Sequence, residues 1–224
     1  MGKYRRTGRS AFRLPVWRAA VSAGQKAAVC LDDRAGGRRS RRFLGFLLVG
    51  IGICFIAAEV NTLLVRLFDG DMIYITTNIT PVTEEVLKSL PVFVFAWTIS
   101  DDRKTLVSIA FATGLGFALL ENLLILIQNI DSVTVPWAFA RGIGAALMHS
   151  VCTSLTGMGI SYIKKRRKLF YCGTFSLMTA AVIYYAIFNS LVQSQYRILG
   201  FILPTLVCVP LFSSLRRETR QSAE

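Results

Sequence analysis

Six long apolar runs dominate the 224-residue sequence. They extend over residues 43–65, 84–99, 104–127, 136–163, 169–193 and 198–215. A helix needs about 20 mostly apolar residues to cross a bilayer, and helices satisfy their own backbone groups there. Only 17% of the residues are charged, against about a quarter in a soluble domain. The sequence therefore predicts an all-α, polytopic transmembrane helical bundle of about six spans.

The charged residues outside these runs predict the domain organisation and the orientation. Residues 1–42 hold 12 of the 26 Lys and Arg residues and predict a basic cytoplasmic tail, disordered or at the membrane surface, that contacts anionic lipids. Residues 43–215 form the predicted transmembrane domain, and residues 216–224 a short basic tail. Residues 164–168 are all Lys or Arg, whereas the loop 128–135 has neither. Because basic loops favour the cytoplasm, we expect a multi-pass plasma-membrane protein with both termini cytoplasmic.

Composition and motifs argue against several other classes of protein, such as nucleic-acid-binding proteins and transporters. The basic tail has no aromatic-interleaved or helix-turn-helix pattern, so nucleic acid is not an expected partner. The five cysteines form no C-x-x-C motif. Nor is there an internal repeat with paired broken helices, the signature of many transporters.

Polar residues within the apolar runs carry the functional argument, because ionisable groups in a membrane are costly. The predicted topology places them in one half of the bilayer, the non-cytoplasmic half, on five different helices. They are Glu59 and Asn61, then Glu84, Glu85 and Lys88, then Glu121 and Asn122, then Arg141 and His149, and finally Tyr184, Tyr185 and Asn189. This agreement predicts a water-accessible site that opens to the non-cytoplasmic side.

Glu84, Glu85, Glu121 and His149 are the candidate catalytic residues. Glu84 and Lys88 have the i,i+4 spacing of a favourable helical ion pair. Glu85 is turned by about 100° from Glu84 and stays free to act as a general base. Each of these residues also has a structural interpretation. The glutamates at 84 and 85 suit a helix N-terminus, and Glu121 suits a hydrogen bond between helices.

The residues expected to support this site are Lys88, Asn122, Arg141, Thr153, Tyr185 and Asn189. His149 is the only histidine, and Thr153 lies one helical turn beyond it on the same face. Arg141 is expected to form an ion pair with one of the glutamates. No cofactor is expected, although zinc remains possible with His149 and Glu121 as ligands. One histidine and no H-E-x-x-H motif make a weak zinc site.

The ordered motifs resemble the PrsW family of intramembrane proteases, which is related to the CAAX-processing glutamic membrane proteases. The resemblance rests on Glu84-Glu85-Val-Leu-Lys88, on Gly116-Phe-Ala-Leu-Leu-Glu121-Asn122, and on Arg141 with His149 and Thr153. It extends from about residue 43 to residue 215. It implies a polytopic helical fold and peptide hydrolysis by a glutamate-activated water. It also implies a membrane-anchored substrate, such as an anti-sigma factor, cut near its extracytoplasmic side. Family analogy favours Glu84 as the base, whereas helix spacing favours Glu85.

One position departs from the family pattern. The family tends to have a His-x-x-x-Asn motif on a late helix, where this chain has Tyr185-Ala-Ile-Phe-Asn189. Tyrosine donates a hydrogen bond to an oxyanion but is a poor base and metal ligand. The departure motivates an alternative: a non-catalytic pseudoprotease or immunity-type membrane protein on the same scaffold.

Overall fold

The computed structural model describes residues 14–68, 74–165 and 167–221, and within them the side chains of residues 36–68, 74–165, 167–210 and 213. The chain divides into two units, Met1–Arg41 and Arg42–Glu224. The described part contains six α-helices and one short π-helix, and no strand. The elements are α1 (Leu14–Phe68), η1 (Ile75–Ile79), α3 (Thr80–Thr98), α4 (Arg103–Gln128), α5 (Val135–Ile160), α6 (Arg167–Val192) and α7 (Arg197–Gln221). The expected all-α class is confirmed.

Four of the described helices are long and apolar enough to span a membrane. They are the part of α1 from Gly36 to Phe68, and α4, α5 and α6. Helix α7 contributes a shorter apolar stretch, Arg197–Pro210. Helix α3 has 19 residues but contains Glu84, Glu85 and Lys88 in its first half. The protein is thus a helical membrane protein, while the count of six spans and the side of each terminus stay predictions.

Helix α1 begins well before the first apolar run. It includes residues 14–42, which the sequence suggested as a separate tail, and it is continuous as far as Phe68. The part after Arg41 belongs to the larger unit and packs there against α3, where the Phe46 and Phe95 rings meet edge to face at 5.4 Å. Contact of the basic segment with lipid stays a prediction.

Capping residues and prolines explain several helix starts. Asp102 has extended backbone angles and accepts a hydrogen bond from the Thr105 amide at 2.8 Å, which caps α4. Prolines near the starts of α3 and α5, Pro81 and Pro136, occupy positions where a helix needs no amide donor.

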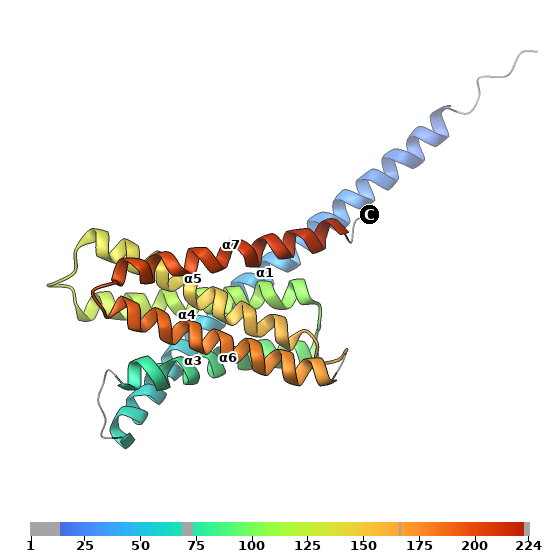
Figure 1. The fold of residues 1–224 in the computed structure, drawn as a ribbon. Coiled ribbons are helices and arrows are strands. Elements are labelled where there is room, and N and C mark those ends of the chain that lie inside the picture. Colours follow the sequence, from blue (N-terminus) through green and yellow to red (C-terminus); the bar gives the residue numbers. More distant parts are fainter. Residues whose placement is uncertain (1–13, 69–73, 166, 222–224) are drawn as a thin grey trace, which may run out of the picture. The chain divides into compact units, whose positions relative to one another are not determined.

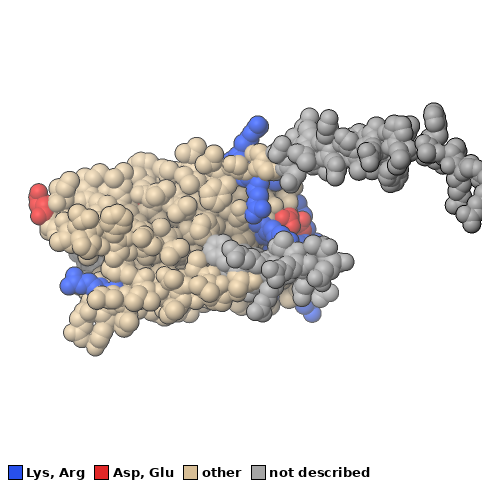
Figure 2. Space-filling view, turned by 90° about the horizontal axis from the view of Figure 1, so that it is seen from above, with Lys and Arg blue, Asp and Glu red and all other residues tan. Residues whose placement is uncertain are grey.

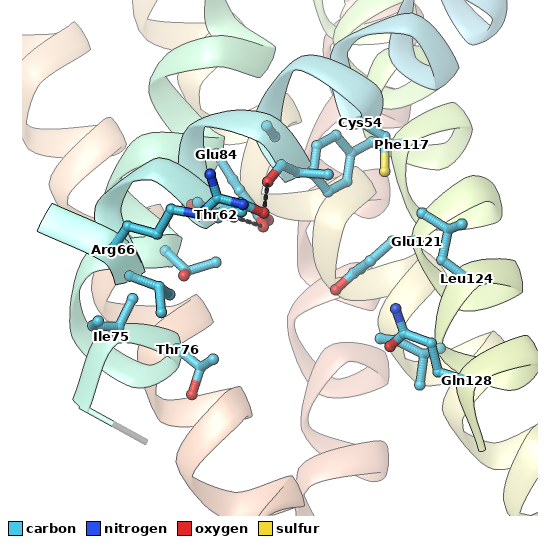
Figure 3. Close-up of a pocket in the computed structure, with 16 residues that line it drawn as sticks. Cys54, Thr62, Arg66, Ile75, Thr76, Glu84, Phe117, Glu121, Leu124 and Gln128 are labelled. Carbon is cyan, nitrogen blue, oxygen red and sulfur yellow. Dashed lines mark hydrogen bonds between the residues drawn. The ribbon is translucent and has the colours of Figure 1, made fainter. Parts of the chain in front are cut away.

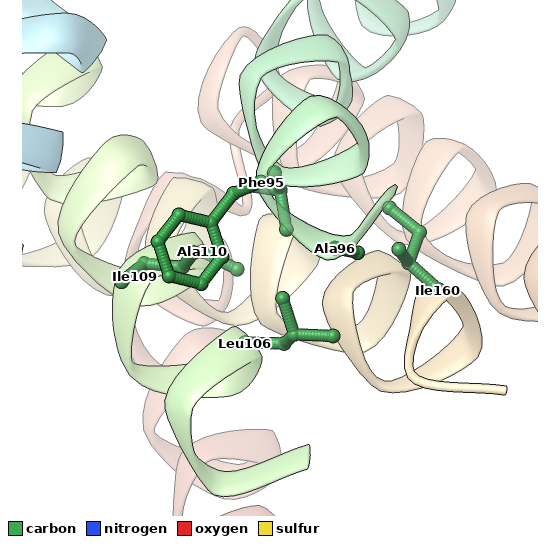
Figure 4. Packing of buried hydrophobic residues seen from close by; sticks show 7 residues of the cluster. Phe95, Ala96, Leu106, Ile109, Ala110 and Ile160 are labelled. Carbon is green, nitrogen blue, oxygen red and sulfur yellow. The ribbon is translucent and has the colours of Figure 1, made fainter. Parts of the chain in front are cut away.

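Helix α5 lies at the centre of the larger unit and packs against α3, α4, α6 and α7, as Figure 1 shows. Gly114 of α4 allows the closest approach, because a Cβ there would collide with the backbone of His149 on α5. One buried apolar cluster joins α3, α4 and α5 (Figure 4). It consists of Val92, Phe95, Ala96, Leu106, Ile109, Ala110 and Ile160. These contacts fix the three helices that carry most of the candidate site.

The surface of the bundle matches a lipid environment. Many large apolar side chains are exposed along the helices, among them Phe55, Leu123 and Phe175. On the face that Figure 2 shows, Lys, Arg, Asp and Glu gather at the two ends of the bundle, with an uncharged band between them. An apolar band of this kind would be unfavourable in water and suits the hydrocarbon core of a bilayer.

Candidate active site

A cleft of about 450 Å³ lies between α1, the η1–α3 region and α4, and we call it the α1–α4 cleft. Glu84 of α3 and Glu121 of α4 line it from two sides (Figure 3). The other lining residues are Cys54, Ala57, Ala58, Asn61, Thr62, Val65, Arg66, Ile75, Thr76, Thr80, Phe117, Leu124, Ile125 and Gln128. Most of this wall is apolar, so the two carboxylates are its main charged groups away from Arg66.

Glu84 is held by hydrogen bonds from two other helices. The Tyr185 hydroxyl of α6 donates to its Oε2 at 2.7 Å, and the Asn61 amide of α1 donates to its Oε1 at 3.1 Å. Asn61 is itself fixed, because the Thr83 hydroxyl donates to its Oδ1 at 3.0 Å. The Glu84 side chain is 4% exposed. Its carboxylate is therefore oriented by neighbours and reaches the cleft with lone pairs still free to accept from water.

Lys88 pairs with Glu85 and not with Glu84. Its Nζ lies 2.5 Å from Glu85 Oε1, an i,i+3 ion pair in which both side chains are fully buried. The expected Glu84–Lys88 ion pair is therefore wrong. Both spacings bring side chains together on a helix, and the interhelical bonds from Asn61 and Tyr185 turn Glu84 away from Lys88. Glu85 does not line the α1–α4 cleft.

The Lys88 ammonium also contacts the histidine. Its Nζ lies 2.8 Å from His149 Nδ1, and the opposite ring nitrogen, Nε2, lies 2.7 Å from Glu121 Oε2. An ammonium group only donates, so Nδ1 is assigned as the acceptor and Nε2 carries the proton that points to Glu121. The Phe117 and Tyr185 rings lie 4.5 and 5.2 Å from the Lys88 nitrogen, within the range of cation–π attraction.

The structure thus brings together the four residues that the sequence singled out as catalytic, from α3, α4 and α5. Tyr185, at the position that departs from the family pattern, lies directly against Glu84. Its ring also meets the His149 ring edge to face, with centroids 4.9 Å apart. A side chain that the sequence presented as a weakness is therefore part of the constellation.

Other expected supporting residues lie elsewhere. Asn189 was expected as a further donor in the site, but its amide donates to the Thr76 carbonyl of η1 at 3.1 Å. Arg141 was expected to pair with a glutamate. Its guanidinium lies over the Trp137 ring at 5.7 Å, and no ion pair to a glutamate is found within the described residues. These two expectations depended on depth in the membrane, which does not fix the direction of a side chain.

Asn122 and Thr153 are buried near the site without entering it. The Thr153 hydroxyl donates to the His149 carbonyl in its own helix at 2.9 Å. Asn122 follows Glu121 and is 8% exposed. Asn61 and Thr83, by contrast, contribute to the site although the sequence predicted no role for either of them. The signal for Asn61 was present in the sequence: an amide side chain within the first apolar run needs a partner.

A family model described as PrsW family intramembrane metalloprotease matches residues 39–215. No curated protein and no solved structure matches the chain. The matched range includes every residue that lines the cleft and every residue of the constellation described above.

The word metalloprotease in that description raises the question of a metal. Catalytic zinc takes three protein ligands, usually His, Cys or carboxylate. Within the described residues no group of three such side chains is arranged to hold a metal ion. Both ring nitrogens of His149 are also engaged, by Lys88 and by Glu121. This donor set does not fit a divalent metal.

Proposed function

The chain belongs to the PrsW family of intramembrane metalloproteases, and on that premise we propose that Glu84 activates a water that hydrolyses a peptide bond of a membrane-anchored protein. Family membership makes the chain a membrane protease, a hydrolase of peptide bonds. The identity of the base, the course of the reaction and the substrate are the proposal.

The observation that carries the choice of Glu84 is its position in the α1–α4 cleft. Glu84 lines the cleft, whereas Glu85 is buried outside it and paired with Lys88. Asn61 and Tyr185 each occupy one Glu84 oxygen from the protein side. A base must lie within hydrogen-bonding reach of the proton that it removes, and among the two adjacent glutamates Glu84 meets this requirement.

The reaction proceeds in two steps. Glu84 takes a proton from the water while the water oxygen bonds to the carbonyl carbon, and negative charge develops on the carbonyl oxygen. The C–N bond then breaks, and Glu84 returns the proton to the leaving amine. The Tyr185 hydroxyl has one proton, which it donates to Glu84 Oε2 in the resting site. As Glu84 takes the proton of the water, this hydroxyl turns from Glu84 to the carbonyl oxygen and donates to the developing oxyanion. No step passes through a metal ion.

Lys88, His149 and Glu121 complete the water site. Lys88 holds His149 with its proton on Nε2, and that proton holds the Glu121 carboxylate. The Glu121 side chain is 22% exposed and lines the cleft on the side of α4. A water between the two glutamates then has two acceptors for its hydrogens, which leaves an oxygen lone pair free for the attack.

The topology of the proposal follows from the loop charges. Six crossings with both termini in the cytoplasm of a multi-pass plasma-membrane protein put the ends of α1 and α4 near Phe68 and Gln128 on the outer side. The cleft reaches Arg66 and Gln128, close to those ends. The cut is accordingly placed near the extracytoplasmic side of a membrane-anchored substrate, such as an anti-sigma factor. Anionic lipids are the proposed partners of the basic N-terminal segment.

Substitution of the carboxylates in proteoliposomes tests the proposal. We expect Glu84→Gln to lower cleavage of a membrane-tethered reporter by at least about 100-fold, the usual contribution of a general base. Glu59→Gln is the matched control, because Glu59 is an exposed carboxylate on α1. Wild-type cleavage by Glu84→Gln would refute the assignment.

Removal of metal ions is a separate test. Because the described donor set does not fit a metal, chelator-treated enzyme is expected to retain its rate. A loss of activity that added zinc reverses would contradict the metal-free mechanism while leaving the family assignment intact.

A non-catalytic protein on the same scaffold is the second candidate, and Tyr185 is the observation that favours it. The Tyr185 hydroxyl contacts Glu84 directly, so the water that Glu84 would activate competes with this hydrogen bond. Tyr185→His discriminates between the two functions. A change from no cleavage to cleavage supports a pseudoprotease, whereas cleavage by the wild type excludes it.

A further inference from the structure

A second cavity lies at the end of the bundle where α4 ends and α5 and α7 begin (Figure 1), and we call it the α4–α7 pocket. Its volume of about 360 Å³ is at the lower end of the range for pockets that bind small molecules. Its lining residues are Ile125, Asn129, Ser132, Val133, Thr134, Trp137 and Arg197. Among the described residues it shares only Ile125 with the α1–α4 cleft. The pocket is therefore separate from the candidate active site.

Arg197, the first residue of α7, is the charged group of this pocket. Its guanidinium makes no ion pair and no hydrogen bond within the described part of the chain. Asp131 belongs to the adjoining loop, but it is exposed and does not line the pocket. A guanidinium presents its N–H donors in a fixed fork that matches the oxygens of a phosphate. The pocket thus holds a positive charge that no described side chain in its wall neutralises.

Two uncharged donors of the wall are also free. The Trp137 indole N–H has no acceptor among the described residues, and the Thr134 side chain makes no capping bond to α5. The Arg141 guanidinium lies 5.7 Å from the Trp137 ring, and its buried Nε has no partner. The side chains of Asn129 and Ser132, by contrast, already donate to backbone carbonyls at 2.8 and 3.1 Å. The groups left free to bind are mainly donors beside positive charge, which is the complement of an anion.

The surroundings of the pocket indicate where this anion comes from. Residues that flank the lining residues in sequence carry large apolar or aromatic side chains that are more than half exposed. They are Ile130, Val135, Phe139, Tyr196 and Ile198. A free phosphate ion gains nothing from such a rim, whereas a phospholipid joins its phosphate to acyl chains that cover apolar surface. Trp and Tyr are also common where a membrane protein meets the headgroup layer. The rim therefore favours a lipid.

From these observations we propose that the α4–α7 pocket binds the phosphate of an anionic phospholipid headgroup. Arg197 pairs with the phosphate, and Thr134 and Trp137 donate further hydrogen bonds to it. A lipid in this position bridges the segment between α4 and α5 and the start of α7. The site takes no part in the proposed hydrolysis, so its occupancy is measured without a cleavage assay.

Native mass spectrometry of the full-length protein in detergent tests the site by counting bound lipids during a titration with dioleoylphosphatidylglycerol. We expect the wild type to bind one lipid more tightly than any further ones. Arg197→Gln is expected to raise the Kd of this lipid by about 10-fold or more, the usual effect of losing a hydrogen bond to a charged group. Arg167→Gln is the matched control, because Arg167 is likewise the exposed first residue of a helix, at the opposite end of α6 and outside the pocket. Its Kd is expected to equal that of the wild type.

A second pair of variants leaves all charges in place. Trp137→Phe keeps an aromatic ring beside Arg141 but removes the indole N–H, so we expect the Kd of the tight lipid to rise a few-fold. Trp97→Phe is its control, because Trp97 is 63% exposed on α3 and lies outside the pocket. This pair decides the question if Arg197→Gln unfolds below the wild type in the absence of lipid.

Two further ligands identify the source of the anion. Dioleoylphosphatidylcholine has the same acyl chains and a phosphate but no net charge, and inorganic phosphate has the charge without the chains. Equally tight binding of the phosphatidylcholine, or displacement of the phosphatidylglycerol by an equal concentration of inorganic phosphate, would overturn the anionic lipid as the ligand. Equal losses of affinity in Arg197→Gln and Arg167→Gln, or in Trp137→Phe and Trp97→Phe, would overturn the pocket as its site. Losses confined to Arg197→Gln and Trp137→Phe would support both.

Discussion

The buried ion pair between Lys88 and Glu85 predicts a specific pattern of rescue. The two side chains are fully buried, and no hydrogen bond to the Glu85 carboxylate is found within the described residues. Lys88→Met leaves this carboxylate without its counter-ion, which costs about 3–5 kcal/mol in a buried pair. Each kcal/mol shifts the unfolding temperature of a chain of this size by roughly 2–4 °C. We therefore expect Lys88→Met to unfold on the order of 10 °C below the wild type.

Replacement of both partners of a buried pair by apolar side chains is often close to neutral. The double variant Lys88→Met/Glu85→Met is thus expected to recover most of the lost stability. The double variant Lys88→Met/Glu84→Met is expected to unfold at or below the temperature of the single variant, because it leaves the Glu85 carboxylate unpaired and also removes the acceptor of Asn61 and Tyr185. Both double variants lack the same contact to His149, so recovery of stability in the Glu85 variant identifies the carboxylate that pairs with Lys88.

Thermal unfolding of the purified protein in detergent, followed by the fluorescence of its three tryptophans, measures all four proteins. Rescue by Glu84→Met but not by Glu85→Met would refute the reasoning. It would mean that Lys88 pairs at i,i+4, and the assignment of Glu84 as the free base would fall with it.

Three further predictions concern the packing of α1 against α4, the Asn189 amide and the N-cap of α4. Gly50→Ala is expected to lower the unfolding temperature, since its Cβ would meet the Thr113 backbone. Gly52→Ala has open space and is expected to be neutral or slightly stabilising. Equal effects of the two substitutions would contradict the close approach of α1 to α4 at Gly50. Asn189→Ala is expected to lower kcat/KM far less than Glu84→Gln, because its amide bonds the Thr76 carbonyl of η1 and neither carboxylate of the cleft; a loss as large as that of Glu84→Gln with an unchanged unfolding temperature would return Asn189 to the catalytic constellation. Asp102→Ala is expected to cost about 1 kcal/mol at pH 7 as a lost cap. Burial raises the pKa of Asp102, but the first-turn donors of α4 outweigh it and hold the pKa below its usual value. The difference in unfolding temperature between the wild type and Asp102→Ala is therefore present above about pH 4 and shrinks as the pH falls further. A difference that persists at pH 2 would contradict the cap.

The helices were the most predictable part of the structure. The apolar run 104–127 became α4 (Arg103–Gln128), and the run 169–193 became α6 (Arg167–Val192). Long apolar segments in a membrane have few alternatives to a helix, so composition alone defines them. The number of membrane crossings was less predictable, because α3 carries three ionisable residues among its 19 residues and does not stand out by hydropathy.

The constellation was predictable in membership but not in pairing. His149, Glu121 and the two adjacent glutamates meet as expected, because ionisable side chains in an apolar bundle have few other places to go. The prediction that Lys88 pairs with Glu84 was wrong, since i,i+3 and i,i+4 neighbours are about equally close on a helix. The rotation of α3 decides between them, and it depends on Asn61 and Tyr185, which are 23 and 101 residues away from Glu84 in sequence.

The single histidine has a practical consequence. Each ring nitrogen of His149 has a different partner, Lys88 at Nδ1 and Glu121 at Nε2. Selective ¹⁵N labelling of histidine therefore gives an NMR spectrum of one imidazole, in which an unprotonated and a protonated nitrogen resonate well apart. The Nδ1 signal reports the buried ion pair, and the Nε2 signal reports the wall of the cleft. A segment bound between Glu84 and Glu121 shifts the second signal more than the first, so occupancy can be followed without a cleavage assay.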